Sequence, residues 1–197
     1  MLLDFGSFLS DISVMTEITV TTDLPAATQQ FILCWGDMGA QWGVNRSIAQ
    51  IHALLYLSSR PLTAEEIADT LALARSNVSN SIKQLQVWGL IRRVPVLGDR
   101  RDFFEAETDV WAMAAKIAAV RKEREIDPAL KALEACVAAA ETDKTMDPEA
   151  RRRLNEMRAF TETMSNWYEQ VVRIPRPKLA SLIRLGSKVI NFLPKTR

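Results

Sequence analysis

The chain has 197 residues, of which 48% are hydrophobic, and its 25 basic and 24 acidic residues give a formal net charge of +1. This length and composition fit one domain with a core and a substantial extension. One histidine and two cysteines provide no zinc-ligand spacing, and no phosphate-binding glycine loop, dinucleotide fingerprint or nucleophile elbow is present, so we expect no metal, no cofactor and no enzymatic activity.

The N-terminal segment carries no signal for export. The first basic residue is Arg46, so the positively charged start of a secretory signal is missing, and no apolar run is long enough to cross a membrane. We therefore expect a cytoplasmic protein. Separately, we expect residues 1–22 to be disordered. Cys34 and Cys136 each lie among apolar residues, which predicts two buried free thiols in a reducing compartment.

Residues 23–73 predict three helices. Asp23 and Pro25 have the signature of a helix start, and apolar residues follow at helical spacing as far as Trp42. A second helix is expected over about 45–58, with its apolar side chains inward.

The third helix, about 64–71, begins at a capping box in which Thr63 precedes Glu66 by three residues. A brief turn leads to a fourth helix over about 74–88. A short helix, a tight turn and a second helix with a polar outward face form a helix-turn-helix arrangement.

The fourth helix has two faces of different chemistry. Val78, Ile82 and Leu85 recur at helical spacing and predict its buried stripe. The opposite face holds Ser, Asn, Arg and Lys, although Ser and Asn prefer caps and turns to helix interiors. No acidic residue occurs between Asp69 and Asp99. This short, polar and basic face indicates contact with a polyanion rather than an ordinary solvated surface.

A β-hairpin is predicted directly after this helix. Gly89 is a natural helix end, and the residues that follow lose the helical period. Residues 90–96 predict a strand, 97–102 a turn and 103–107 the returning strand. A helix-turn-helix followed by a hairpin is a winged helix.

The predicted hairpin tip carries two adjacent arginines, Arg100 and Arg101. Such a pair suits a minor groove or two phosphates. The alternative is a salt bridge to Asp99 or Asp102, and we expect Asp99 to brace an arginine rather than to contact DNA.

The last third of the chain predicts helices. Asp127-Pro128 and Asp147-Pro148 each have the pattern of a cap followed by a first-turn proline, so a helix is expected to begin at each. A final amphipathic helix is expected over about 178–192; it either packs into a dimer interface, contacts phosphates or lies on an anionic membrane surface. The helix after Asp147 carries an apolar seam of about two heptads: Met157, Phe160, Met164, Trp167 and Val171.

The predicted fold class is therefore mainly α with a small β-hairpin. A winged helix-turn-helix domain with leading helices is expected over 23–110. A helical dimerisation region with a basic amphipathic tail is expected over 111–197.

The segment 45–107 resembles the winged-helix domain of the MarR superfamily, and most closely its GbsR branch of glycine-betaine-synthesis regulators. The likeness is carried by Arg46-Ser47, by LTAEEIADTL, by RSNVSNSIKQLQVWGLI, and by GDRR before an aromatic and an acidic residue. It extends over about residues 30–170. The resemblance implies a homodimeric repressor or activator that binds a pseudo-palindromic operator, with some members of the family responding to a small ligand.

The resemblance also implies which residues contact double-stranded DNA. Asn and Arg pair with adenine and guanine edges, and Ser bonds either base edges or phosphates. Lys83, further along the helix, and Arg46 suit phosphates. The implied set is Arg46, Arg75, Ser76, Asn77, Ser79, Asn80, Lys83, Arg100 and Arg101.

The aromatic residues suggest an effector site, because aromatic cages bind quaternary ammonium groups by cation–π attraction. The simpler interpretation is that these rings belong to the core, and His52 is expected to lie in the core or in a dimer interface. The candidate ligand-binding residues are Trp35, Trp42, Tyr56, Trp111, Trp167 and Tyr168.

We thus predict a homodimeric DNA-binding transcriptional regulator, with a small molecule such as a quaternary amine as its candidate effector. The alternative is a winged-helix module for protein interaction within a larger assembly. A protein-docking surface would carry exposed aromatic or aliphatic side chains, and the polar face of residues 75–83 favours nucleic acid instead.

Overall fold

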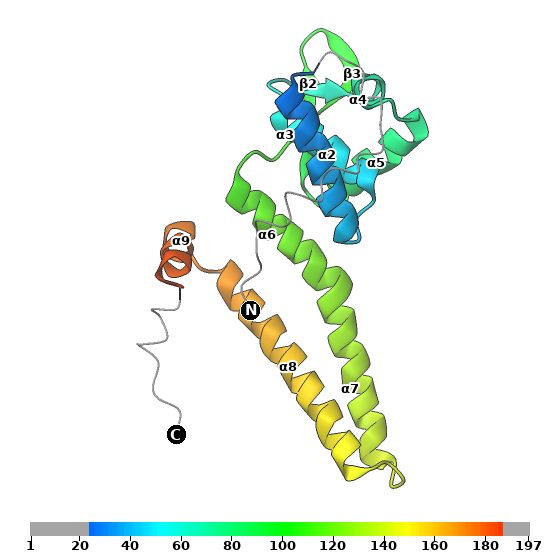
Figure 1. Cartoon of the computed structure of the whole chain (residues 1–197), viewed down its shortest axis with the longest axis vertical. Coiled ribbons are helices and arrows are strands. Elements are labelled where there is room, and N and C mark those ends of the chain that lie inside the picture. The colour runs from blue at the N-terminus through cyan, green and yellow to red at the C-terminus, as the bar shows by residue number, and fades with distance from the viewer. Residues whose placement is uncertain (1–23, 187–197) are drawn as a thin grey trace. The chain divides into compact units, whose positions relative to one another are not determined.

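The computed structural model describes residues 24–186. The chain folds into two compact units, Met1–Glu107 (unit 1) and Thr108–Arg197 (unit 2), and Figure 1 labels most of their elements. The expected disorder of residues 1–22 and the capping role of Asp23 lie outside the described residues. The same is true of the last predicted helix beyond Gly186.

Unit 1 contains the four predicted helices, and their predicted positions are confirmed to within a few residues. Sequence signals account for two of the starts. The Asn45 side chain accepts a hydrogen bond from the Ser47 N–H, and Thr63 and Glu66 form the predicted capping box. The helices are α2 Ala26–Gln41, α3 Arg46–Leu57, α4 Ala64–Leu71 and α5 Arg75–Val87.

The capping box also fixes a surface charge. The Thr63 Oγ1 accepts from the Glu66 N–H at 3.2 Å, and the Glu66 carboxylate accepts from the Thr63 N–H at 2.7 Å. The Arg60 guanidinium donates to the same carboxylate, and this bond is the main reason that the pKa of Glu66 is lowered to about 2. Glu66 therefore keeps its negative charge at the start of α4, where the helix dipole favours it.

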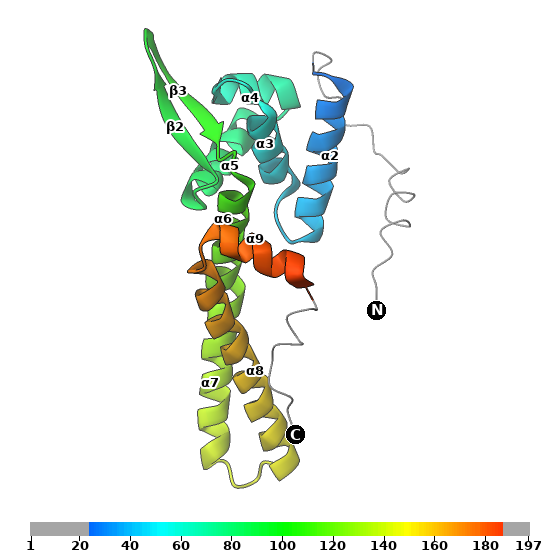
Figure 2. The ribbon, with the colours of Figure 1, turned by 90° about the vertical axis from the view of Figure 1, so that its left-hand side faces the viewer.

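A small antiparallel sheet completes unit 1. Strands β1 (Leu62–Thr63), β2 (Ile91–Val96) and β3 (Asp99–Ala106) lie in the order β1-β3-β2. Figure 2 shows β2 and β3 as a hairpin that extends beyond the helices of this unit. Strand β1 was not predicted, because two residues are too few to show an alternating pattern.

The predicted six-residue turn of the hairpin is wrong. The turn consists of Leu97 and Gly98 alone, and β3 begins at Asp99. Gly98 takes a positive φ of 83°, which lets the chain reverse within two residues. The pairing is irregular between Val94 and Val96, around a proline that has no N–H to donate to the ladder.

The core of unit 1 lies where the helices meet the sheet. Phe103 and Phe104 of β3 are both buried, and His52 of α3 is 3% exposed. The core alternative for His52 is therefore confirmed within a single chain. The largest fully buried side chains of the core are Ile32, Ile51, Ile67, Val78 and Leu85.

Unit 2 is helical throughout its described part. Helix α6 (Val110–Arg121) passes through a π-helical turn, η2 (Lys122–Ile126), into α7 (Asp127–Thr142). Helix α8 (Pro148–Val172) packs against α7, and α9 (Arg176–Leu185) follows it.

The predicted start at Asp127-Pro128 coincides with the start of α7, but the predicted capping by Asp127 is wrong. Helical backbone runs through this point, and Ile126 and Asp127 both have helical φ and ψ angles. A proline inside a helix has no N–H to donate, and its ring clashes with the carbonyl one turn earlier. The wider π-helical turn immediately before Pro128 accommodates both problems. The start at Asp147 is confirmed, since its carboxylate accepts from the Ala150 N–H at 2.9 Å.

Unit 2 buries little of its own apolar surface. Met113, Val137, Ala140 and Ser165 are the buried side chains in its described part. Cys136 is exposed because Val137 and Ala140 occupy the buried side of α7, and Cys34 of unit 1 is exposed as well. The predicted burial of both thiols is therefore wrong for the single chain.

The described residues, 24–186, contain no helix that is long and apolar enough to span a membrane. In this same part of the chain, no group of three or more His, Cys, Asp and Glu side chains is arranged to hold a metal ion.

Candidate nucleic-acid interface

Backbone conformation and backbone hydrogen bonds define both ends of helix α5. Before it, Ala72 takes the left-handed conformation at the end of α4, and the Leu73 N–H donates to the Ala68 carbonyl. After it, Gly89 has a positive φ, and the Leu90 N–H donates back to the Leu85 carbonyl. This last pattern is a Schellman motif, which closes a helix and redirects the chain. The chain thereby passes directly from α5 into the hairpin of β2 and β3, Ile91–Ala106, which is the wing.

The predicted two faces of α5 are both present. The buried face holds Val78, Ile82 and Leu85, as expected, together with Ser81. A buried serine within an apolar stripe was not predicted, because composition alone does not say which serine turns inward. Five of the predicted DNA contacts on α5 are exposed to solvent: Arg75, Ser76, Ser79, Asn80 and Lys83.

Asn77 differs from the other polar residues of α5 because its side chain is bonded within the protein. Its Nδ2 donates to the Ser47 Oγ at 2.9 Å, and its Oδ1 accepts from the Ser81 hydroxyl at 3.3 Å. Ser47 lies in the first turn of α3, so this chain of bonds ties α5 to α3. In this arrangement the Asn77 amide positions the helix, and base contact by Asn77 stays a prediction.

The basic residues of unit 1 are balanced by acidic ones. Residues 24–107 contain eight basic and eight acidic residues. Six of the basic side chains form salt bridges, all of them at 2.5–2.7 Å: Arg46–Asp37, Arg60–Glu66, Arg75–Glu65, Arg92–Glu105, Arg93–Asp102 and Arg101–Asp99.

Lys83 and Arg100 are the two basic side chains of residues 24–107 that form no salt bridge within the described part of the chain. Both are exposed, Lys83 on α5 and Arg100 on β3. A phosphate that binds either of them displaces no carboxylate. The paired arginines must first exchange a partner, although exposed ion pairs contribute only about 0–1 kcal/mol and open readily.

The two wing arginines behave differently. The Arg101 guanidinium donates to both carboxylate oxygens of Asp99 and lies over the Phe103 ring, 5.4 Å from its centroid. These bonds lower the pKa of Asp99 to about 2, so the pair stays charged. The predicted bracing of an arginine by Asp99 is confirmed, and Arg100 is the wing arginine left available.

Three further arginines, which were not predicted as DNA contacts, lie at the surface of unit 1. Arg60 precedes β1, and Arg92 and Arg93 lie exposed on β2 of the wing. The sequence signal that could have identified the pair on β2 is that the two arginines are adjacent within a predicted strand. Neighbouring side chains of a strand point to opposite faces. Arg46, which was predicted, is half-exposed at the start of α3 and bonded to Asp37 of α2.

The winged-helix segment of the chain is similar to known proteins. The family model described as MarR family matches residues 42–102, which run from the end of α2 to the wing. Over residues 42–102 the chain is therefore similar to the MarR family. The match covers the helix-turn-helix and the wing described above, and the winged-helix fold class with its helical extension is confirmed.

Two curated proteins resemble the chain. The HTH-type transcriptional repressor GbsR of Bacillus subtilis is 20% identical over 156 residues, which are 78% of this chain and 83% of GbsR. The HTH-type transcriptional regulator MmpR5 of Mycobacterium tuberculosis is 29% identical over 116 residues, which are 57% of this chain and 64% of MmpR5. Both matches are longer than the segment 42–102 that the family model covers.

A solved structure described as a transcriptional regulator has the same fold. It superposes with a TM-score of 0.58 at 22% identity, and the match covers 74% of this chain and 95% of that one. The coverage shows that the likeness of fold extends beyond the segment 42–102 that the family model covers.

The candidate ligand residues fall in both units. In unit 1, Trp35 and Tyr56 belong to one cluster of rings with Phe31 and His52, with centroids 5.6–6.4 Å apart. Trp42 lies half-exposed at the end of α2. In unit 2, Trp111 and Trp167 are exposed, whereas the Tyr168 hydroxyl is buried without a hydrogen-bond partner in the described part of the chain.

His52 is the one ionisable imidazole of the unit 1 ring cluster. Burial lowers its pKa to about 4, because desolvation disfavours the charged imidazolium. Its Nε2 has no hydrogen-bond partner among residues 24–186. His52 is therefore neutral at pH 7, and a positively charged ligand in contact with it meets no charge repulsion.

Proposed function

We propose that this chain is a sequence-specific DNA-binding transcriptional regulator that acts as a homodimer in the cytoplasm and has no enzymatic activity. The observation that carries the proposal is the outward face of α5, where Ser76, Ser79, Asn80 and Lys83 are exposed beside a wing with an available arginine. The similarity to the MarR family supports the proposal, since the match spans both elements.

In this proposal α5 enters the major groove. Asn80 pairs with an adenine edge, and the serines contact base edges or phosphates, which close approach allows because their side chains are short. Lys83 and Arg100 neutralise phosphates on either side. Much of the affinity then comes from released counterions, so it falls steeply as the salt concentration rises.

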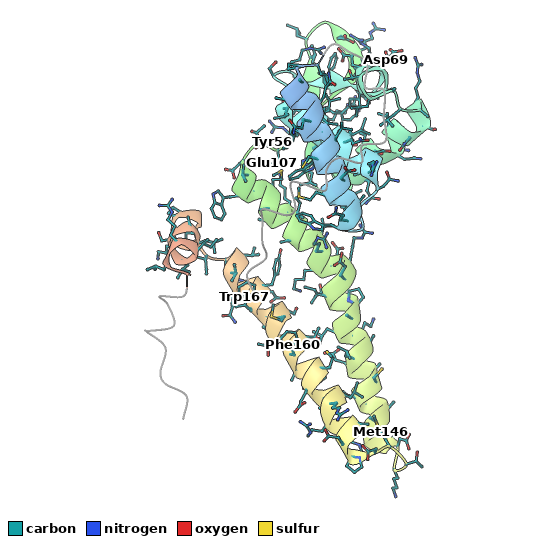
Figure 3. All side chains as sticks on the ribbon, viewed as in Figure 1. Tyr56, Asp69, Glu107, Met146, Phe160 and Trp167 are labelled. Carbon is teal, nitrogen blue, oxygen red and sulfur yellow. The ribbon has the colours of Figure 1, made fainter. Side chains whose placement is uncertain are left out.

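The homodimer is supported by the exposed seam of α8. The predicted residues Met157, Phe160, Met164 and Trp167 are all exposed in the single chain, and Phe160 is 64% exposed. Figure 3 marks Phe160 and Trp167 along this helix. An apolar stripe of this length is unfavourable in water, and a second copy of the same stripe covers it with matching chemistry. Two copies then present two α5 helices to successive major grooves.

A GbsR-like response to a small ligand is a finer part of the proposal. It is supported by the likeness to GbsR and by the neutral ring cluster of Trp35 and Tyr56. The ligand class would be a small cation such as a quaternary amine, held by ring faces. Titration of the full-length dimer with choline and with glycine betaine, followed by tryptophan fluorescence, tests this part.

The second candidate function is a protein-interaction module. It is favoured by one observation, the number of exposed apolar residues in unit 2, which suit a protein partner as well as a second copy. The two functions differ in what the outward face of α5 does. A protein-interaction module has no reason to bind DNA in preference to other polyanions.

The test is selection of duplexes from a random DNA pool, followed by affinity measurements on the selected sequence and on scrambled DNA. We expect the dimer to prefer the selected sequence by about a thousandfold, as specific binders do. The Ser76→Ala/Asn80→Ala double variant should lose most of this preference and keep its affinity for scrambled DNA.

The matched control is Asn155→Ala, which removes an exposed asparagine from α8 and should keep the full preference. If no sequence is enriched over scrambled DNA, the regulator proposal fails and the interaction module takes its place. If the double variant keeps its preference, the reading surface lies elsewhere than α5.

A further inference from the structure

The tip of the wing is apolar on one strand and basic on the other. Pro95, Val96 and Leu97 are all exposed at the end of β2 and in the turn, and the Leu97 side chain is fully open to solvent. Arg100 and Arg101 follow on β3. The exposed leucine is unusual for a two-residue turn, where Gly, Asn, Asp, Ser and Pro predominate.

Packing within unit 1 does not account for these apolar residues. The buried residues of β2 and β3 are Ile91, Phe103 and Phe104, which lie toward the base of the hairpin. Near the tip the pairing of β2 with β3 is irregular between Val94 and Val96, and irregularities of this kind generally bend a strand and redirect its side chains. The fold itself does not require a leucine at the turn.

Local hydrogen bonds also define the conformation of the tip. Gly98 closes the turn with its positive φ, and Asp99 at the next position accepts from the backbone N–H of Arg101 at 2.9 Å as well as from its guanidinium. A side chain that projects from a turn already shaped by such bonds requires little further ordering of the backbone on binding. Arg100 stands beside it without a carboxylate partner in the described part of the chain.

We propose that Leu97 is a minor-groove wedge that inserts between two base pairs of the operator and kinks the duplex. The inference rests on the proposed DNA-binding function and adds an apolar contact that the arginines do not supply. Apolar wedges such as leucine partly unstack a base step and bend DNA toward the major groove. Val96 and Pro95 would then contact the sugars of the groove walls, and Arg100 the adjacent phosphate.

Duplex DNA fits this surface better than a protein partner does. A protein partner would be expected on a wider apolar patch, and the tip offers three adjacent residues next to an available guanidinium. A second copy of the chain is better served by the longer seam of α8. The combination of a small apolar point and positive charge is complementary to a groove lined by sugars and phosphates.

A wedge makes a sequence prediction. Pyrimidine–purine steps such as TA and CA are easily unstacked, whereas A-tracts are stiff. The dimer should therefore favour a flexible base step at the wing position, which is the step of the operator into which Leu97 inserts. This preference arises although no side chain there reads base edges. This preference should depend on Leu97.

The experiment combines one protein change with one DNA change. Full-length wild type, Leu97→Ala and Leu57→Ala are measured on the duplex selected from a random pool, with either TA or AA at the wing position. A 2-aminopurine at that step reports unstacking, and energy transfer between the duplex ends reports bending. Leu57→Ala makes the same truncation at an exposed leucine of α3, outside the β2–β3 hairpin.

We expect wild type and Leu57→Ala to bend the TA duplex, to raise 2-aminopurine fluorescence and to bind TA more tightly than AA. Leu97→Ala should bind the TA duplex about tenfold more weakly for each of the two wings, or about a hundredfold for the dimer, because each wing loses the burial of most of a leucine side chain. It should also lose the fluorescence change and the TA preference. Its melting temperature should equal that of wild type, because the Leu97 side chain is fully exposed.

Two outcomes overturn the wedge, and a third overturns the function beneath it. If Leu97→Ala keeps the same affinity, bend and step preference, Leu97 does not insert. If the variant changes the oligomeric state in sedimentation and leaves bending unchanged, the tip is a protein contact. If wild type enriches no sequence at all, the proposed regulatory function fails, and this result is distinct from the other two.

Discussion

At the residue scale, the two asparagines on α5 have different environments despite their similar positions in the sequence. Asn80 is exposed, whereas Asn77 joins Ser47 of α3 to Ser81 of α5. The sequence predicted both as DNA contacts, because the residue type and the helical face are the same. Only the position of α3 relative to α5 separates them, and this relation depends on packing between distant residues.

The difference predicts unequal effects on stability. Asn77→Ala should lower the free energy of unfolding by about 1–2 kcal/mol, because it leaves Ser47 and Ser81 without their shared partner. Asn80→Ala should change it by less than about 0.5 kcal/mol, as exposed substitutions usually do. Urea unfolding followed by circular dichroism measures both. Equal changes in the free energy of unfolding for the two variants would show that the hydrogen bonds of Asn77 contribute nothing to stability.

His52 should make stability depend on pH. Its pKa is about 4 in the folded chain and 6.5 when it is exposed, so the unfolded state binds a proton more readily. The stabilising contribution is present above pH 6.5 and is lost as the pH falls from 6.5 to 4. By linkage the loss is on the order of 3 kcal/mol.

The measurement is urea unfolding of wild type and His52→Leu at pH 7, 6, 5 and 4. Both proteins lose some stability as their carboxylates are protonated, but the wild-type curve should be steeper between pH 6.5 and 4. Parallel curves for the two proteins would mean that the imidazole is not desolvated in the folded chain.

At the element scale, local signals predicted the helices of unit 1 well. The capping box of Thr63 and Glu66 and the closing glycine at position 89 both appear as expected, since each depends on residues within one turn of the other. The length of the wing turn was not predictable in the same way. Residues 97–102 are mostly polar and contain a glycine, and only the pairing of Val96 with Asp99 shows that the turn is two residues long.

The π-helical turn illustrates a second limit of sequence reasoning. Asp127-Pro128 and Asp147-Pro148 have the same pattern, yet only Asp147 caps a helix, whereas the helical backbone of η2 continues through Asp127 into α7. At the first, Lys122 forms salt bridges with Asp127 at 2.7 Å and with Glu169 of α8 at 3.3 Å, and these bonds raise its pKa. Tertiary contacts of this kind support continuous helix through the proline, and a local pattern cannot reveal them.

At the scale of the whole molecule, unit 2 has more apolar surface than it can bury by itself. The seam of α8 was predicted from its spacing of three and four residues, and its exposure in one chain is what a dimer interface requires. The sequence does not predict which further surfaces of one protomer contact its partner. The reason is that apolar residues in a core and in an interface have the same pattern.

Disruption of the seam should dissociate the dimer. Phe160→Asp places a charge in the proposed interface, where burial without a partner is strongly unfavourable. We expect sedimentation at micromolar concentration to give a monomer, with affinity for the selected duplex reduced at least a hundredfold. Lys131→Ala on the exposed side of α7 is the control. A dimer that persists in Phe160→Asp would exclude the seam as the interface.

The most direct test of the central claim is the salt dependence of DNA binding, measured for wild type, Lys83→Ala, Arg100→Ala and the Lys131→Ala control. Each phosphate contact contributes about 0.9 to the slope of log affinity against log salt, and each variant removes one contact per protomer. We therefore predict that the slope falls by about 2 for Lys83→Ala and for Arg100→Ala, and stays at the wild-type value for Lys131→Ala. Wild-type slopes in both α5 and wing variants would contradict the assignment of α5 and the wing as the DNA-binding surface.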